Sequence, residues 1–124
     1  MQPTVNSGAL KTRTKQLALV VIRLCRALPS SPEARIITRQ LLRSATSVAA
    51  NYRAVCRARS AADFTSKLGL VLEEADETLF WLELLVDANV VRPEQVRLAL
   101  DEANQLVSIF VASLRTVKGL KSEI

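Results

Sequence analysis

Apolar side chains recur at intervals of three and four residues in four segments of the chain, which is the pattern of helices that bury one face. The first segment covers about residues 9–28 and ends before Pro29, because the residue preceding a proline disfavours the helical conformation. The second begins at Pro32, with Ser31 as its predicted N-cap, and continues to about Arg59 without an internal Gly or Pro. The expected core residues of these two helices are Leu17, Val21, Leu24, Leu28, Ile37, Leu41, Val48, Tyr52 and Val55.

The third and fourth segments are bounded by similar signals. A capping-box variant at residues 60–63 starts the third helix, which runs to about Ala88 and is expected to stop at a left-handed Asn89. Pro93 opens the fourth helix and Gly119 is expected to close it. Their predicted core stripes are Phe64, Leu68, Val71, Ala75, Leu79, Leu82 and Val86, and then Val96, Leu100, Ala103, Val107, Phe110, Leu114 and Val117.

Long helices joined by short turns must fold back on their neighbours, which predicts an all-α, antiparallel up-down-up-down four-helix bundle. A chain of 124 residues has the size of one domain. We expect the bundle to occupy residues 9–118, with a flexible N-terminal tail at 1–8 and a C-terminal tail at 119–124.

The residues needed for most catalytic and metal sites are missing. The chain has no histidine, and its three glycines are too far apart for a phosphate-binding loop. Glu74 and Glu77 are too few carboxylates for a di-iron bundle, which also needs Glu-x-x-His pairs. Cys25 and Cys56 have no Cys-x-x-Cys spacing, and the bundle places them roughly 30 Å apart, beyond disulfide reach. The sequence therefore predicts a protein that is not an enzyme and holds no metal or cofactor.

The apolar pattern also bears on location. The longest apolar run, residues 17–22, is far shorter than the roughly 20 residues that cross a bilayer, so no membrane span is expected. The first eight residues lack a basic start followed by an apolar stretch, as a secretory signal would have. We expect a cytoplasmic protein.

Charge is strongly segregated along a chain whose net charge is +5. Residues 1–59 carry eleven Lys or Arg and one acid, whereas residues 60–91 carry seven acids and one Lys. On the second helix, four arginines project within about 40° of one another, namely Arg35, Arg39, Arg53 and Arg57. The first helix adds Lys15, Arg23 and Arg26, and we interpret both sets as a surface for the phosphate backbone of RNA or DNA. Alternatively, the arginines are solvated or pair, within or across subunits, with Glu73, Asp76, Glu83 and Asp87 of the third helix.

Apolar residues also occur outside the predicted core stripes. Leu19 and Ile22 on the first helix, and Leu70, Trp81 and Leu84 on the third, project to a second face, and Phe80 falls among the acids of the third helix. The interface residues that we expect are Leu19, Ile22, Leu70, Phe80 and Trp81. Such residues can be scattered surface positions, but an exposed apolar face that includes Phe and Trp favours a homo-oligomer interface.

A polar seam is predicted between the second and third helices. If these helices fold back about Ser60, residues whose numbers sum to about 120 lie opposite each other, which places Arg43 against Glu77. We predict a buried ion pair there that also involves Glu74, with Gln40, Ser47 and Asn51 completing its hydrogen bonds and fixing helix register. The alternative is that both charges point to solvent.

The pattern Gln40-x-x-Arg43-x-x-x-Ser47-x-x-x-Asn51, followed by Leu68 and Glu77, resembles a bacterial four-helix-bundle family. That family was first noticed as reading frames within intervening sequences of ribosomal RNA genes. The resemblance covers roughly residues 15–117, but residues 52–55 read Tyr-Arg-Ala-Val where family members usually have an Ile-Ala-Glu-Gly-like run.

Distant relatives of this family are accessory proteins of diversity-generating retroelements, which form pentamers and bind a reverse transcriptase and nucleic acid. The resemblance thus implies a pentamer, with a reverse transcriptase or another protein as a possible partner. We expect a homo-oligomeric basic bundle that binds nucleic acid or a nucleic-acid-handling protein; the alternative is a protein-only scaffold whose charges serve assembly.

Overall fold

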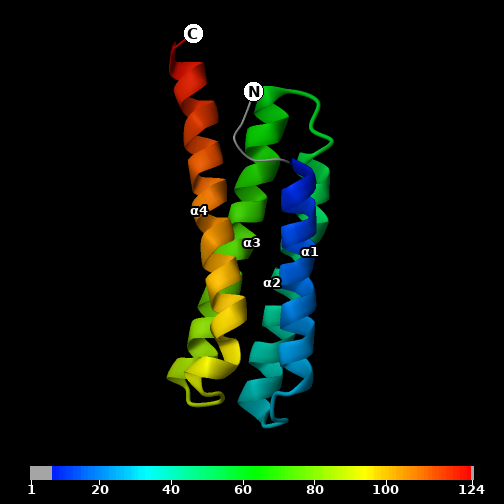
Figure 1. Cartoon of the computed structure of the whole chain (residues 1–124), viewed down its shortest axis with the longest axis vertical. Helices are drawn as coiled ribbons and strands as arrows, with labels where there is room; N and C mark the ends of the chain where they lie inside the picture. Colours follow the sequence, from blue (N-terminus) through cyan, green and yellow to red (C-terminus); the bar gives the residue numbers. More distant parts are fainter. Residues whose placement is uncertain (1–6, 124) are drawn as a thin grey trace.

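The computed structural model describes residues 7–123, with side chains described up to residue 119. The helices are α1 (Ser7–Arg26), α2 (Pro32–Val55), α3 (Ala61–Asp87) and α4 (Pro93–Glu123). Figure 1 shows them running alternately down and up the long axis, so that each is antiparallel to the next in the chain. Because α1 also packs against α4, the four helices close into a bundle, as predicted.

The predicted start signals are confirmed at α2 and α3. The backbone N–H of Ala34 donates to the Ser31 hydroxyl at 3.3 Å, with Pro32 in the first turn. At α3, the N–H of Asp63 donates to the Ser60 hydroxyl at 3.0 Å. The Asp63 carboxylate accepts the backbone N–H of Arg59, one residue earlier than a standard capping box requires.

The α3–α4 turn also has its predicted conformation. Asn89 has φ of 60°, the left-handed conformation expected after a helix end. The N–H groups of Asn89 and Val90 donate to the carbonyls of Val86 and Leu85, each at 2.9 Å, and so satisfy carbonyls that the helix end leaves open.

Four helix boundaries differ from the predictions. Helix α1 starts two residues early, at Ser7, so residues 7 and 8 of the tail expected at 1–8 are helical, and the rest of that tail lies outside the described residues. Helix α1 also ends at Arg26 instead of Leu28. Helix α2 ends at Val55 instead of Arg59, because the N–H groups of Arg57 and Ala58 bond to carbonyls three residues back, which tightens the chain into the turn.

Gly119 does not close α4, which continues to Glu123. A glycine ends a helix by adopting a positive φ, and Gly119 does not. Inside a helix, Gly costs only about 1 kcal/mol relative to Ala, which is not enough by itself to stop one.

The core of the described residues is mainly aliphatic and contains one stacked aromatic pair. Tyr52 of α2 and Phe110 of α4 stack with ring centroids 5.9 Å apart and thereby join two helices that lie diagonally across the bundle. The predicted α2 stripe is buried in full. In α3 the buried sector is broader than predicted: it includes Thr78 and Leu85, while Trp81 and Leu84 pack partly buried against the core.

The broader sector follows from the position of α3, which packs against both α2 and α4. A helix with two neighbours buries its flanks as well as its central stripe. Trp81 and Leu84 therefore belong to the bundle and not to a separate outer face. None of the described helices combines the length and apolar character that crossing a membrane requires.

Candidate nucleic-acid interface

The arginines of α2 form an outward face of the bundle, which we call the basic face: Arg35, Arg39, Arg53 and Arg57. All four side chains are exposed, and none makes an ion pair with any side chain in the described part of the chain. Three lie on α2 itself, whereas Arg57 follows the helix end in the α2–α3 turn, a correction to its predicted helical position. The guanidinium groups thus remain available to phosphate oxygens.

Helix α1 carries exposed cations of its own. Lys15, Arg23 and Arg26 are exposed and form no ion pair among residues 7–119. Arg13 behaves differently: its guanidinium contacts Glu102 and Gln105 of α4, each at 2.8 Å. It was not singled out in the sequence, because α1 and α4 are far apart in the chain and no turn defines which of their residues face each other.

Four acidic residues of α3 are also exposed. Glu73, Asp76, Glu83 and Asp87 form no ion pair within the described chain. The basic face is therefore not neutralised by α3 within one subunit, as one alternative had it. Because the basic face and the acids of α3 are both exposed, they could still form ion pairs between subunits.

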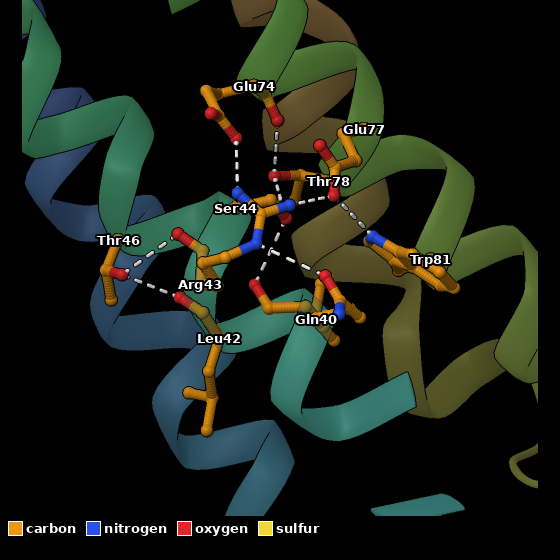
Figure 2. Close-up of polar contacts among 10 residues, drawn as sticks. Gln40, Leu42, Arg43, Ser44, Thr46, Glu74, Glu77, Thr78 and Trp81 are labelled. Carbon is orange, nitrogen blue, oxygen red and sulfur yellow. Dashed lines mark hydrogen bonds and ion pairs between the residues drawn. The ribbon is translucent and has the colours of Figure 1, made fainter. Parts of the chain in front are cut away.

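The polar cluster between α2 and α3 is centred on Arg43 (Figure 2). The Arg43 guanidinium forms an ion pair with Glu77 and a second one with Glu74 at 3.2 Å. Its Nε also donates to the Gln40 side-chain carbonyl at 3.2 Å, and Trp81 Nε1 donates to Glu77 at 3.0 Å. The predicted pairing of Arg43 with Glu77 is thus formed.

The cluster is not buried, contrary to the prediction. The Arg43 side chain is 46% exposed, and those of Glu74 and Glu77 are 24% and 34% exposed. Pairs in contact with solvent usually contribute little to stability. The Trp81 hydrogen bond, followed by the Arg43 guanidinium, lowers the pKa of Glu77. The hydrogen bond to Glu77 is the largest cause of a raised Arg43 pKa, so both groups are charged at neutral pH.

Ser47 and Asn51, predicted to complete this cluster, make no side-chain hydrogen bond within the described residues. The polar contact that is buried lies one position further round each helix. The hydroxyls of Ser44 and Thr78 are 2.9 Å apart, and both residues are fully buried. The same register that pairs Arg43 with Glu77 also brings Ser44 close to Thr78. Their contact was not predicted, because small side chains such as these are common in helix cores.

The predicted second apolar face is only partly present. Leu70 is 53% exposed and Phe80 is 51% exposed, and they lie among the acidic residues of α3. Leu19 and Ile22 are half-buried on α1. Trp81 contacts Phe80 edge to face, with ring centroids 4.8 Å apart, but packs against the core. The surface thus offers separate apolar positions on α1 and α3.

No group of three or more Cys, Asp or Glu side chains that could hold a metal ion occurs in the part of the chain that the structure describes. The fold and surface define a small, basic, all-α four-helix bundle with its charges segregated between helices. The chain belongs to the family described as 23S rRNA-intervening sequence protein, whose model matches residues 9–112.

A solved structure from Bacteroides thetaiotaomicron is similar to this chain. It is described as a protein with unknown function from the S23 ribosomal protein family. The two share 31% sequence identity with a TM-score of 0.77, over 84% of this chain and 96% of that chain. A search of curated proteins finds no match.

Proposed function

We propose that this chain is a non-enzymatic homo-oligomer that binds nucleic acid, or a protein that handles nucleic acid, through its basic face. The observation that carries the proposal is that Arg35, Arg39, Arg53 and Arg57 are exposed without an acidic partner among the described residues. Membership of a family named for an intervening sequence of ribosomal RNA supports a role connected with RNA.

Binding on such a surface is led by the phosphate backbone. The basic face carries no aromatic side chain on which bases would stack, so we expect tolerance of sequence. Each phosphate that an arginine neutralises releases counterions, which makes affinity fall steeply with salt. With roughly four phosphate contacts to a single strand, affinity should fall about 50-fold between 50 and 200 mM salt.

The test is fluorescence anisotropy with labelled RNA and DNA oligonucleotides over a range of salt concentrations. The double variant Arg35→Glu/Arg53→Glu should abolish binding while circular dichroism shows the helices intact. Arg97→Glu on α4 is the matched control, because Arg97 is exposed and outside the basic face. If the wild-type protein does not bind even at low salt, nucleic-acid binding is excluded.

A second candidate is a protein-only assembly scaffold. The observation that favours it is that Leu70 and Phe80 are exposed among unpaired acids of α3, a surface complementary in charge to the basic face. Contact between the basic face of one subunit and α3 of the next would build a ring, of which the pentamer suggested by family resemblance is one case. Light scattering measures the oligomer; a monomer at micromolar concentration would exclude both the ring and the scaffold.

A further inference from the structure

A hollow lies at the corner where α2 turns into α3, and we call it the corner hollow. Its volume is about 520 Å³, and it is lined by Ala50, Arg53, Ala54, Arg57, Arg59 and Lys67. The hollow is wide open to solvent. Four of its six lining residues are cations, although only two of these, Arg53 and Arg57, belong to the basic face.

The positive charge of the corner hollow is only partly neutralised. Asp63 accepts a hydrogen bond from Lys67 at 2.9 Å and one from the backbone N–H of Arg59 at 3.1 Å. No other acid forms an ion pair with the four cations in the described part of the chain. Arg53 and Arg57 thus line the hollow without an acidic partner, whereas Arg59 and Lys67 share the single charge of Asp63. The hollow therefore keeps an excess of positive charge, which an anion would stabilise.

The shape of the corner hollow suits a compact anion. Ala50 and Ala54 contribute only methyl groups, so a ligand can come close to the α2 backbone without displacing a side chain. Recognition is therefore left to the cations that surround them. Arginine presents a planar fork of N–H donors that matches two oxygens of a phosphate group, and Lys67 adds a point charge.

A second hollow, at the other end of α2, provides a comparison within the same molecule. Its volume is about 380 Å³, and it contains Arg35 and Arg39. Its other residues include the apolar Leu28, Pro29 and Leu42. With half the number of cations and a lining that is apolar in larger proportion, it is a weaker candidate for an anion.

We infer that the corner hollow is a binding site for a phosphate group, carried either by a nucleic-acid backbone or by a free diphosphate. The inference deepens the proposed function, and rests on it for the nucleic-acid source. It adds Arg59 and Lys67 to the arginines of the basic face and localises the tightest phosphate contact at the α2–α3 corner.

The experiment compares the wild-type protein with Arg57→Ala and with the control Arg97→Ala. Arg57 is exposed in the turn and makes no side-chain hydrogen bond within the described chain, so its loss should leave the fold intact, as circular dichroism would show. Inorganic pyrophosphate is titrated by calorimetry and a short labelled RNA by anisotropy. Loss of a charged hydrogen bond should weaken binding roughly tenfold or more in Arg57→Ala, and not in the control.

The two measurements distinguish the sources of the phosphate. Weaker pyrophosphate binding alone supports a free diphosphate as ligand. Weaker RNA binding alone, with a salt slope reduced by about one, supports a backbone phosphate, and weakening of both supports either source. If Arg57→Ala affects neither ligand more than Arg97→Ala does, the site is overturned. If Arg57→Ala still binds RNA as the wild type does, the proposed function stands without the site. If pyrophosphate binding depends on Arg57 but the protein does not bind RNA, the site stands without the proposed function.

Discussion

Thr78 of α3 and Ser44 of α2 meet in the apolar interior with their hydroxyl oxygens 2.9 Å apart. Each hydroxyl also contacts a backbone carbonyl of its own helix, that of Glu74 at 2.8 Å and that of Leu41 at 3.2 Å. The pair lies beneath the Arg43 cluster, so the α2–α3 contact has a buried neutral layer and an outer charged layer.

This geometry predicts that the two hydroxyls are coupled. Thr78→Val removes one partner and should cost about 1–2 kcal/mol in the free energy of unfolding, because the buried Ser44 hydroxyl loses a contact. The double variant Ser44→Ala/Thr78→Val removes both groups and should be no less stable than the single one. Urea denaturation of the wild type, Ser44→Ala, Thr78→Val and the double variant measures the coupling, and strictly additive losses would contradict it.

The Arg43 cluster predicts an acid transition that the only tryptophan of the chain can report. The Trp81 hydrogen bond and Arg43 hold the pKa of Glu77 below its usual 4.5. The charged carboxylate is thus favoured by folding, so its contribution to stability is present above pH 4.5 and is lost as pH falls through the lowered pKa. Trp81 fluorescence should change with a midpoint below 4.5 while the helices remain folded.

Two variants separate the causes of that transition. In Arg43→Ala the midpoint should move up yet stay below 4.5, because the Trp81 hydrogen bond is the larger cause. In Glu77→Gln the fluorescence change should disappear. A wild-type midpoint at or above 4.5 would show that the Trp81 hydrogen bond is absent in solution.

The packing of α4 predicts opposite outcomes for the same substitution at two positions. Leu106 is fully buried, so Leu106→Ala should cost about 2–5 kcal/mol through lost burial and a cavity. Leu98 on the same helix is 66% exposed, so Leu98→Ala should change stability by less than about 0.5 kcal/mol. Thermal or urea unfolding measures both, and a large loss at Leu98 would instead place it in a subunit interface.

The two cysteines should differ in reactivity. Burial raises the pKa of the Cys25 thiol to about 11, so only about one molecule in a thousand carries its thiolate at pH 8. Cys56 is exposed at the end of α2. A thiol-specific reagent should therefore label Cys56 first, and the Cys56→Ser variant should react slowly until it is unfolded. Equal rates at both thiols would contradict the burial of Cys25.

The sequence was most informative where a local signal and the apolar period agree. Ser31 and Ser60 cap their helices, and Asn89 adopts its left-handed conformation, because these roles depend on residues within one turn. The prediction at Gly119 was wrong because a glycine ends a helix only when it adopts a positive φ. Glycine permits that conformation but does not require it, and Gly119 does not adopt it.

Prediction was weaker for contacts between helices that are distant in the chain. The α2–α3 turn is short enough to set a register, and this is why Arg43 could be matched with Glu77. No comparable turn relates Arg13 to Glu102, so their ion pair could not be predicted. Trp81 was wrongly assigned to an outer face because a projection of one helix does not show how much of that helix its neighbours cover.

The separation of the cations of α1 and α2 from the acids of α3 also gives the molecule a permanent electric dipole. A polyanion would attract the basic face and repel the acids of α3, so the molecule would be turned toward its target before contact. This orientation acts on the rate of association, which should fall steeply as the salt concentration rises. In a closed ring the same dipole would favour head-to-tail neighbours, since each subunit would present unlike charges to the next.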